Sequence, residues 1–250
     1  MLELKNISKS FGGVKAVDNL SLYFTQGKIF SLVGPNGAGK TTVFNLINGF
    51  LEPDKGEIFF RKKPIGNFPP WKIAGLGIGR LFQDIRIFEN LSCIDNVLLA
   101  DKDNPGENPA NVFFSSERVR KFEEKNIEKA KHWLDFVGLS GKEETSAENL
   151  SYGQQKLLSL ARLMAGEYDF LLLDEPTSGV NPAMIKEILD LVKKVVKEVG
   201  KTVVIIEHNM SVIMETADFV YFMDEGRVVT FGAPKDVLED PRVREAYTGL

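Results

Sequence analysis

The sequence predicts an α/β fold with a parallel central sheet, an N-terminal antiparallel β region and an inserted α-helical subdomain. Three observations lead to this prediction. Apolar and polar residues alternate over residues 2–7 and roughly 17–25, the pattern of half-exposed antiparallel strands. After residue 169, short apolar runs alternate with helical patterns in the manner of βαβ units. Residues from about 90 to 150 are instead rich in lysine and glutamate and have helical periodicity.

Further elements are expected between these landmarks. An apolar strand at 29–33 precedes a helix at 40–50, and a strand at 57–60 follows a turn at 53–56. In the helical subdomain, helical spacing relates Ile127, Ala130, Leu134 and Val137, and a helix-breaking stretch at 104–109 lies near its start. An amphipathic helix is expected at 182–199, and short helices after Pro234 around 237–238 and 243–247.

The most informative segment directly follows the strand at 29–33. It reads GPNGAGKTT from Gly34 to Thr42, a full match to G-x-x-x-x-G-K-[ST]. Glycines let such a loop turn tightly and point its N–H groups inward at a helix N-terminus, which creates an anion nest. Lys40 is expected to reach the β- and γ-phosphates, and the Thr41 hydroxyl to ligate Mg²⁺. The residues expected to bind the nucleotide here are Gly34, Asn36, Gly37, Ala38, Gly39, Lys40, Thr41 and Thr42. The sequence therefore predicts a site for ATP and Mg²⁺.

Two acidic residues end a second buried strand. The run 170–173 is wholly apolar and is followed by Asp174 and Glu175. Such a run is typical of a central parallel strand, and ligands bind at the carboxyl ends of these strands. Two acids at a strand end are often only a solvated turn. Beside a phosphate-binding loop, however, Asp174 is expected to hold Mg²⁺, and Glu175 to accept a proton from the attacking water.

The segment Leu150–Gln154 reads LSYGQ and resembles the LSGGQ signature of ATP-binding cassette (ABC) ATPases, a family of P-loop NTPases with a RecA-like core. The resemblance implies that Ser151, Gly153 and Gln154 begin a helix and bind the γ-phosphate of ATP held by the opposite subunit. Tyr152 departs from the commonest form, which has glycine at the middle position.

Other segments resemble the remaining family elements and occur in the expected order. Gln83 matches the Q-loop glutamine, a ligand of Mg²⁺ and water, and 178–182 matches the D-loop, with Asn181 where many members carry aspartate. His208 matches the switch histidine that touches the γ-phosphate, and Phe11, expected on the turn between the first two strands, matches the aromatic residue that stacks on adenine. The resemblance thus implies that Glu175 and His208 are catalytic and that Thr41, Gln83 and Asp174 bind the metal.

The same resemblance implies a single ABC ATPase domain over residues 1–250. Its catalytic core is expected at about 1–89 and 160–235, its helical subdomain at about 90–159, and short C-terminal helices at 236–250. Family members of this kind work with a second ABC ATPase subunit, identical or related, with two transmembrane permease subunits and indirectly with a periplasmic or extracellular solute-binding protein.

Composition limits the partners further. The net charge of −4 gives no support for nucleic acid as a partner, and the single cysteine, Cys93, fits a reducing cytoplasm. No run reaches the ~18 apolar residues of a membrane span. The chain is therefore expected in the cytoplasm, held at the inner face of the cell membrane by its permeases. His132 lies on a helical face without site context and is expected to be solvated.

Several strings are similar to the LivG-type ATP-binding subunits of branched-chain amino acid importers. They include 11–17, 45–50, 150–155, 206–210, the polar insertion near 101–122 and the ending 240–247. This similarity implies import of branched-chain or other hydrophobic or neutral amino acids. Urea or short-amide importers use very similar ATPases, and a lipopolysaccharide-type exporter is a further alternative.

Two other classes of protein remain open. Soluble ABC proteins of translation or DNA repair usually carry two cassettes in one chain or a long coiled-coil insertion, and this chain has neither. A nucleotide-binding module without hydrolysis is disfavoured because Glu175 and His208 are both present.

Overall fold

The computed structural model describes residues 1–100 and 116–248. The helix-breaking stretch expected at 104–109 and most of the polar insertion expected near 101–122 lie outside the described residues. The chain divides into two compact units. The first unit comprises Met1–Gln83, Tyr168–Ser178 and Val192–Leu250, and the second comprises Asp84–Glu167 and Gly179–Leu191.

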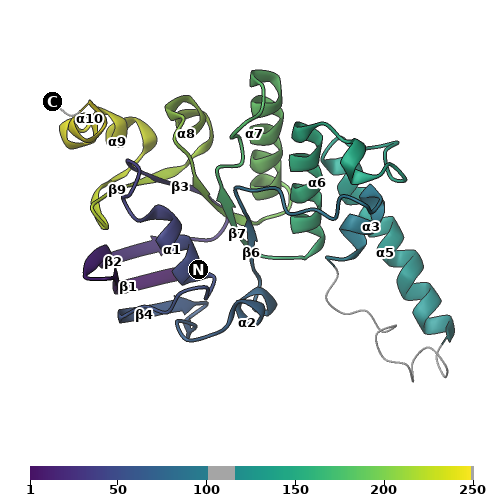
Figure 1. The fold of residues 1–250 in the computed structure, drawn as a ribbon, viewed down its shortest axis with the longest axis horizontal. Helices are drawn as coiled ribbons and strands as arrows, with labels where there is room; N and C mark the ends of the chain where they lie inside the picture. Colours follow the sequence, from purple (N-terminus) through teal and green to yellow (C-terminus); the bar gives the residue numbers. More distant parts are fainter. Residues whose placement is uncertain (101–115, 249–250) are drawn as a thin grey trace. The chain divides into compact units, whose positions relative to one another are not determined.

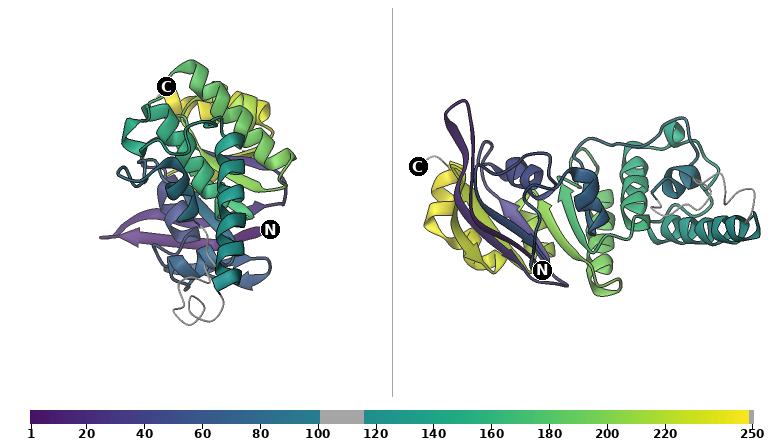
Figure 2. Two further views of the ribbon diagram at one scale, coloured as in Figure 1. Left: turned by 90° about the vertical axis from the view of Figure 1, so that its right-hand side faces the viewer. Right: turned by 90° about the horizontal axis from the view of Figure 1, so that it is seen from below.

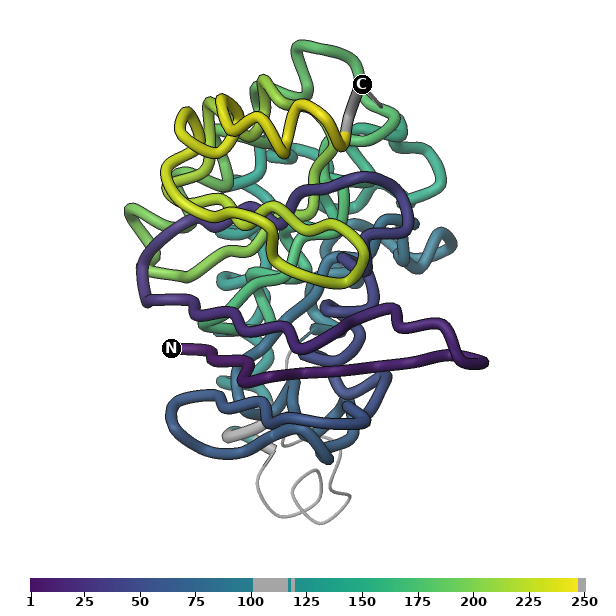
Figure 3. Tube along the Cα trace, turned by 90° about the vertical axis from the view of Figure 1, so that its left-hand side faces the viewer, coloured from purple at the N-terminus to yellow at the C-terminus, as the bar shows by residue number. Residues whose placement is uncertain are grey.

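The first unit contains an antiparallel sheet in the strand order β2-β1-β4-β5 (Figure 1). Its strands are β1 (Leu2–Phe11), β2 (Val14–Phe24), β4 (Lys55–Phe60) and β5 (Lys63–Pro64). The strands β1 and β2 form a long hairpin, drawn in purple in Figure 3, in which Phe11 pairs with Val14 across a Gly12–Gly13 turn. Phe11 is thus the last residue of β1, whereas the sequence placed it on the turn.

A second sheet of the first unit has the order β10-β9-β3-β8-β7-β6. Its strands are β3 (Ile29–Val33), β6 (Ile78–Leu81), β7 (Phe170–Asp174), β8 (Thr202–Ile206), β9 (Phe219–Asp224) and β10 (Arg227–Gly232). Five strands run parallel, and β10 pairs antiparallel with β9. Every residue of β3, β7 and β8 is buried, as expected for parallel strands covered on both faces.

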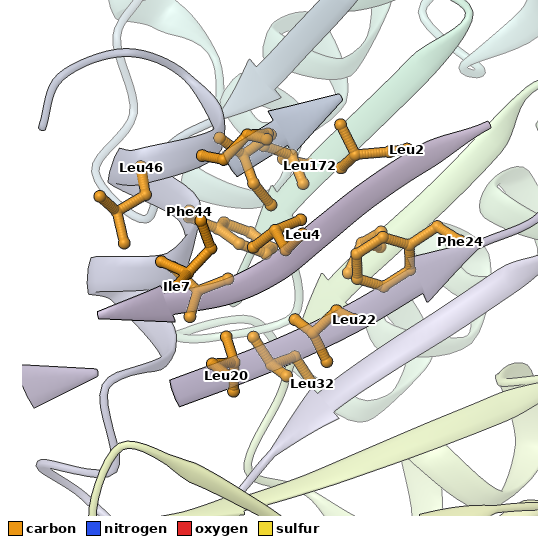
Figure 4. Packing of buried hydrophobic residues seen from close by; sticks show 14 of the residues in the cluster. Leu2, Leu4, Ile7, Leu20, Leu22, Phe24, Leu32, Phe44, Leu46 and Leu172 are labelled. Atoms are coloured by element: carbon orange, nitrogen blue, oxygen red, sulfur yellow. The ribbon is translucent and has the colours of Figure 1, made fainter. Parts of the chain in front are cut away.

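The hydrophobic core of the first unit joins its two sheets and α1 (Lys40–Ile47). Figure 4 shows how side chains of β1 and β2 pack with Leu32 of β3, Leu172 of β7 and Phe44 of α1. The ring of Phe24 contacts those of Phe30 and Phe170 edge-on at centroid distances of 5.1 and 5.7 Å. This core fixes the carboxyl ends of β3 and β7 against the start of α1. A short helix, α2 (Pro70–Gly75), adds Ile73 to the same core.

A smaller core lies on the other face of the parallel sheet. Alternate residues of β9 divide between the two cores, since Tyr221 and Met223 belong to the larger core, and Val220 and Phe222 to the smaller one. The smaller core also contains residues of α8 (Met210–Thr216), α9 (Pro234–Glu239) and α10 (Pro241–Thr248).

The second unit is helical. It contains α3 (Cys93–Leu98), α5 (Ser116–Phe136), a single 3₁₀ turn η2 (Ala147–Asn149), α6 (Tyr152–Ala165) and the first part of α7 (Pro182–Lys197). The helices α3, α5 and α6 contact one another, and α3 and α5 lie side by side in Figure 2. Ala130, Leu134 and Val137 of the predicted helical stripe are buried, and His132 is exposed as predicted. None of the helices in the described residues has the length and apolar character needed to cross a membrane. The predicted α/β class, with its antiparallel β region and helical subdomain, is confirmed.

Candidate nucleotide-binding site

The loop between β3 and α1 has a backbone that only glycine permits at two points. A side chain at Gly34 would place Cβ 2.0 Å from the Met223 carbonyl oxygen of β9, and at Gly39 it would lie 2.3 Å from that of Ala16 in β2. Gly39 also has φ of +95°, in the left-handed region. The two glycines therefore let the loop pass directly against the backbone of neighbouring strands.

The helix that follows has no side-chain cap. Gly39 occupies the N-cap position of α1 and offers no side-chain hydrogen bond to the first turn. Uncapped N–H groups and the positive end of the helix dipole form a site for an anion. A cavity of about 220 Å³ opens here. Its lining residues are Ala16, Asn36, Gly37, Gly39, Lys40, Thr41, Thr42, Glu175, Ile206 and His208.

Lys40 is folded back onto the loop. Its Nζ donates hydrogen bonds to the carbonyl oxygens of Gly34 and Pro35 at 2.8 and 2.9 Å. Burial lowers the pKa of the Lys40 ammonium, and the negative charges of Glu175 and Asp174 act in the opposite direction. The ammonium is therefore already positioned inside the phosphate-binding loop, where two carbonyl groups replace part of its hydration.

Glu175 lies between Gln83 and His208. Its Oε1 is 3.0 Å from His208 Nε2, and its Oε2 accepts a hydrogen bond from Gln83 Nε2 at 3.0 Å. Glu175 also adopts φ of +47°, which is uncommon and costly for a residue with a side chain. Three predicted site residues from three separate segments thus meet at the carboxyl ends of β6, β7 and β8.

The loop after Glu175 is fixed by a contact that no motif in the sequence indicates. The buried Glu207 accepts hydrogen bonds from the backbone N–H and the hydroxyl of Thr177, at 3.1 and 2.7 Å. Glu207 directly precedes His208, and Thr177 follows Glu175 by two residues. The contact therefore joins the two chain segments that carry Glu175 and His208. A buried glutamate at the end of an apolar strand was the available signal.

Asp174 is the buried end of β7. Its Oδ2 accepts a hydrogen bond from Arg80 Nη2 at 2.6 Å, and Arg80 Nη1 donates to Asn45 Oδ1 at 2.7 Å. Arg80 was not among the predicted site residues.

The predicted metal ligands fit Mg²⁺ by their chemistry. Thr41, Gln83 and Asp174 supply a hydroxyl, an amide and a carboxylate, the hard oxygen donors that Mg²⁺ prefers. No group of three or more histidine, cysteine, aspartate or glutamate side chains in residues 1–100 and 116–248 is arranged to hold a metal.

The predicted signature residues begin α6 in the second unit. Ser151 Oγ accepts a hydrogen bond from the Gln154 N–H at 3.4 Å, and Gln154 Oε1 accepts one from the Ser151 N–H at 3.1 Å, which forms a capping box. At Gly153 a side chain would place Cβ 2.9 Å from Met184 Cε of α7. Tyr152 is half-exposed, and its ring lies against Gly179, where an added Cβ would be 3.0 Å from Tyr152 Cε1.

Phe11 is one of several predicted site residues that do not line the cavity. The others are Gly34, Ala38, Gln83, Asp174, Ser151, Gly153 and Gln154. Phe11 is 47% exposed, and the Lys9 ammonium lies 5.8 Å from its ring centroid. Asp54 holds this end of β1, since its carboxylate accepts hydrogen bonds from Lys9 Nζ and the Ser10 N–H, both at 2.7 Å. Of the β1–β2 hairpin, Ala16 of β2 lines the cavity, and it lies five residues after Phe11 in the chain.

Comparison with known proteins places this geometry in a family. The pattern of the family described as "ABC transporter" matches residues 17–178. The chain is 34% identical to the high-affinity branched-chain amino acid transport ATP-binding protein LivG of Salmonella typhimurium, over 100% of this chain and 98% of that protein. It is 36% identical, with the same coverage, to the corresponding protein BraF of Pseudomonas aeruginosa.

Solved structures of ATP-binding cassettes are similar to this chain over most of its length. The ADP conformation of MJ1267, an ATP-binding cassette of an ABC transporter, has a TM-score of 0.86 and 35% identity, and covers 100% of this chain and 99% of its own. A dimeric post-hydrolysis state of the cassette MJ0796, bound to ADP and Pi, has a TM-score of 0.76 and 25% identity, and covers 94% of this chain and 99% of its own. The phosphate-binding loop, the Glu175–His208 pair and these full-length similarities have one explanation: the chain belongs to the ABC transporter family.

Proposed function

We propose that this chain is the ATP-binding and ATP-hydrolysing subunit of an ABC transporter that imports branched-chain or other hydrophobic or neutral amino acids. The observation that carries the proposal is the cavity in which the phosphate-binding loop faces Glu175 and His208. The similarity to LivG and BraF along the whole chain supports the class of solute.

ATP binding uses charges and dipoles that the loop already holds in place. The triphosphate enters the cavity against the N–H groups at the start of α1, and Lys40 exchanges two carbonyl contacts for phosphate oxygens. Thr41, Gln83 and Asp174 are the residues that would hold Mg²⁺. When bound there, Mg²⁺ would neutralise negative charge on the triphosphate.

Hydrolysis depends on the orientation of one carboxylate. Both oxygens of Glu175 are engaged, one by Gln83 and one by His208, so the group is held in a single orientation. In that position Glu175 accepts a proton from the attacking water, while His208 contacts both Glu175 and the γ-phosphate. Positioning of this kind and charge neutralisation by Lys40 supply most of the catalysis of phosphoryl transfer.

A second cassette completes each site in this proposal. Ser151, Gly153 and Gln154 of a facing subunit would meet the γ-phosphate, with the hydroxyl of Ser151 and the N–H groups at the start of α6 as donors. The dimeric state of the related cassette MJ0796 supports the pairing of two cassettes.

The segment 85–91 is the proposed contact with the permeases. Phe88 is half-exposed in it, while Asn96 holds the Phe88 backbone with hydrogen bonds of 2.8 and 2.9 Å and the Arg162 guanidinium lies 5.0 Å from the Phe88 ring centroid. A fixed loop that exposes an aromatic ring suits the docking of a short helix of a partner. Two permeases would thereby hold the chain at the inner membrane face, with a solute-binding protein on the other side.

Transport by the assembled complex tests the proposal. The chain, its two permeases, the second cassette and the solute-binding protein are reconstituted in liposomes, and uptake of labelled leucine and of labelled urea is measured with and without ATP. We expect leucine uptake that requires ATP and is lost with Glu175→Gln. ATP-dependent uptake of urea alone would assign the chain to short-amide import. No ATP hydrolysis in the assembled complex would contradict the catalytic assignment itself.

A further inference from the structure

Arg80 and Asp174 form a buried ion pair beside the proposed metal site. Their side chains are only 4% and 6% exposed, and Arg80 Nη2 lies 2.6 Å from Asp174 Oδ2. Taking two charges out of water is costly, and the cost is recovered only where the geometry is good and further hydrogen bonds are made. Whether this pair is well accommodated at the end of β7 therefore depends on what else holds the Arg80 guanidinium.

The guanidinium of Arg80 is held by more than the carboxylate. Its other amino group donates to Asn45 Oδ1 at 2.7 Å, and the rings of Phe82 and Phe44 lie 4.7 and 5.5 Å from its central carbon. A planar guanidinium that lies near two aromatic rings and directs two donors at two acceptors has a defined orientation, which a lysine ammonium would not have.

The contacts of Arg80 join the three elements that carry the proposed Mg²⁺ ligands. Asn45 lies on α1 one turn after Thr41, and residues four apart occupy the same face of a helix. Asp174 ends β7. Arg80 itself lies in β6, three residues before Gln83. One side chain thus fixes α1, β6 and β7 relative to one another at the ligand positions.

We propose that Arg80 is a positioning residue for the Mg²⁺ site: it holds the Asp174 carboxylate in one orientation and ties it to α1, so that Mg²⁺ binds with ATP without rearrangement of this carboxylate. This inference rests on the proposed function, because it assumes that Asp174 is a metal ligand. Residues that orient metal ligands in this way typically change metal affinity by about 10–100-fold when they are replaced.

The test compares ATP affinity with and without Mg²⁺. Titration calorimetry in Mg²⁺ and in EDTA gives the gain in affinity that Mg²⁺ provides, for the parent and for Arg80→Lys and Arg80→Gln, all bearing Glu175→Gln so that ATP is not consumed. We expect the gain to fall about 10-fold or more in Arg80→Gln and less in Arg80→Lys, while the affinity in EDTA stays within about twofold.

Two further variants separate positioning from stability. Asn45→Ala removes the hydrogen bond between Arg80 and Asn45 but leaves the Arg80–Asp174 ion pair. We therefore expect the Mg²⁺ gain to fall, but by less than in Arg80→Gln. Arg61→Gln is the matched control, since Arg61 pairs with the half-exposed Asp169 just before β7, and we expect an unchanged Mg²⁺ gain. Melting temperatures of all variants show which of them remain folded, and Asn45→Ala keeps the test valid if both Arg80 variants unfold.

Each outcome has one meaning. A lower melting temperature with an unchanged Mg²⁺ gain would make Arg80 purely structural and overturn the inference. A larger gain would show that Arg80 competes with the metal, which also overturns it. If the parent itself binds ATP without any Mg²⁺ gain, the proposed function fails first, and this result is distinguishable because it does not depend on Arg80.

Discussion

The aromatic ring at position 11 is fixed at the end of a hairpin without being buried. Lys9 and Asp54 hold the last residues of β1, and Phe11 remains 47% exposed. A large exposed apolar side chain on a held backbone is available for contact with a ligand. This agrees with the proposed stacking on adenine, although the ring lies outside the residues that line the phosphate cavity.

Replacement of Phe11 should therefore weaken nucleotide binding and leave the fold intact. Stacking of aromatic rings contributes about 0.5–1.5 kcal/mol beyond area burial, so Phe11→Ala should weaken ATP binding roughly three- to tenfold. Titration calorimetry measures the affinity. Tyr23→Ala is the control, because Tyr23 is an aromatic residue of similar exposure on β2, and it should change the affinity by less than about twofold. Equal affinity of Phe11→Ala and the parent protein would rule out the stacking.

The site residues that the sequence predicted are those whose chemistry is tied to a motif. Lys40 and Glu175 could be placed because the phosphate loop and the acidic strand end each have a fixed pattern. Arg80 and Glu207 could not. A single charged residue within or after an apolar strand shows that a partner is needed, but the partner comes from a distant segment, such as Asp174 for Arg80. The order of strands in the sheet decides which segments meet, and local sequence patterns do not specify that order.

At the scale of elements, the start of α6 uses residues that also belong to the proposed phosphate contact. Ser151 and Gln154 cap each other's backbone, so in this structure the Ser151 hydroxyl stabilises its own helix. The same hydroxyl is proposed to meet a γ-phosphate. The two roles predict different consequences for different replacements.

Ser151→Ala should lower the free energy of unfolding by about 1 kcal/mol, the usual cost of a lost N-cap. Ser151→Asp should retain most of that stability, because aspartate caps as well as serine. It should nevertheless abolish ATP hydrolysis in the assembled complex, since a carboxylate would face the γ-phosphate. Urea denaturation and phosphate release measure the two effects. Full hydrolysis in Ser151→Asp would remove Ser151 from the phosphate site.

The boundaries of elements differ from prediction where glycine is involved. The turn predicted at 53–56 ends earlier, because β4 already begins at Lys55. Gly56 has φ of +86°, and a side chain there would meet the Lys5 carbonyl at 2.3 Å, so this glycine serves close strand pairing and not a turn. The helix predicted at 40–50 ends at Ile47, and Gly49 with φ of +72° follows. The sequence alone does not show whether a glycine forms a turn, ends a helix or allows two strands to approach closely.

At the scale of the first unit, ion pairs join segments that lie far apart in the sequence. Asp18 of β2 accepts hydrogen bonds from Arg227 Nε of β10 at 3.0 Å and from Lys15 Nζ at 3.1 Å. A backbone hydrogen bond connects the same segments: the Asp18 N–H in β2 donates to the carbonyl oxygen of Gly226, directly before β10, at 3.0 Å. The hydrogen bond from Arg227, followed by that from Lys15, lowers the pKa of Asp18.

This shift predicts a loss of stability in acid. The lowered pKa means that the charged pair stabilises the fold above the unfolded pKa of about 4, and that this contribution disappears as the pH falls through the lower folded value. Asp18→Asn should therefore be less stable than the parent at pH 7, and the difference should shrink below about pH 4. Urea denaturation at several pH values measures it, with the exposed Glu52→Gln as control. A difference that stays constant down to pH 3 would contradict the assignment.

The last prediction concerns the whole molecule and its partner. Glu175→Gln keeps the shape of the side chain but cannot accept a proton. The rate of hydrolysis should therefore fall about 10²–10⁴-fold, the usual contribution of a general base. It also removes a negative charge beside the triphosphate, which relieves repulsion in the ATP-bound state. Both effects should leave ATP bound and two cassettes associated, which size-exclusion chromatography with ATP detects once the second cassette is supplied.

Lys40→Ala separates this effect from a general loss of function. It removes the ammonium that now contacts the Gly34 and Pro35 carbonyl oxygens, so triphosphate binding and association should both be lost. The two variants thus have the same low ATPase activity and opposite elution behaviour, because one retains the ligand that joins the cassettes and the other cannot bind it. Hydrolysis by Glu175→Gln at the parental rate would show that Glu175 is not the base, and its contacts with Gln83 and His208 would then have to serve another purpose.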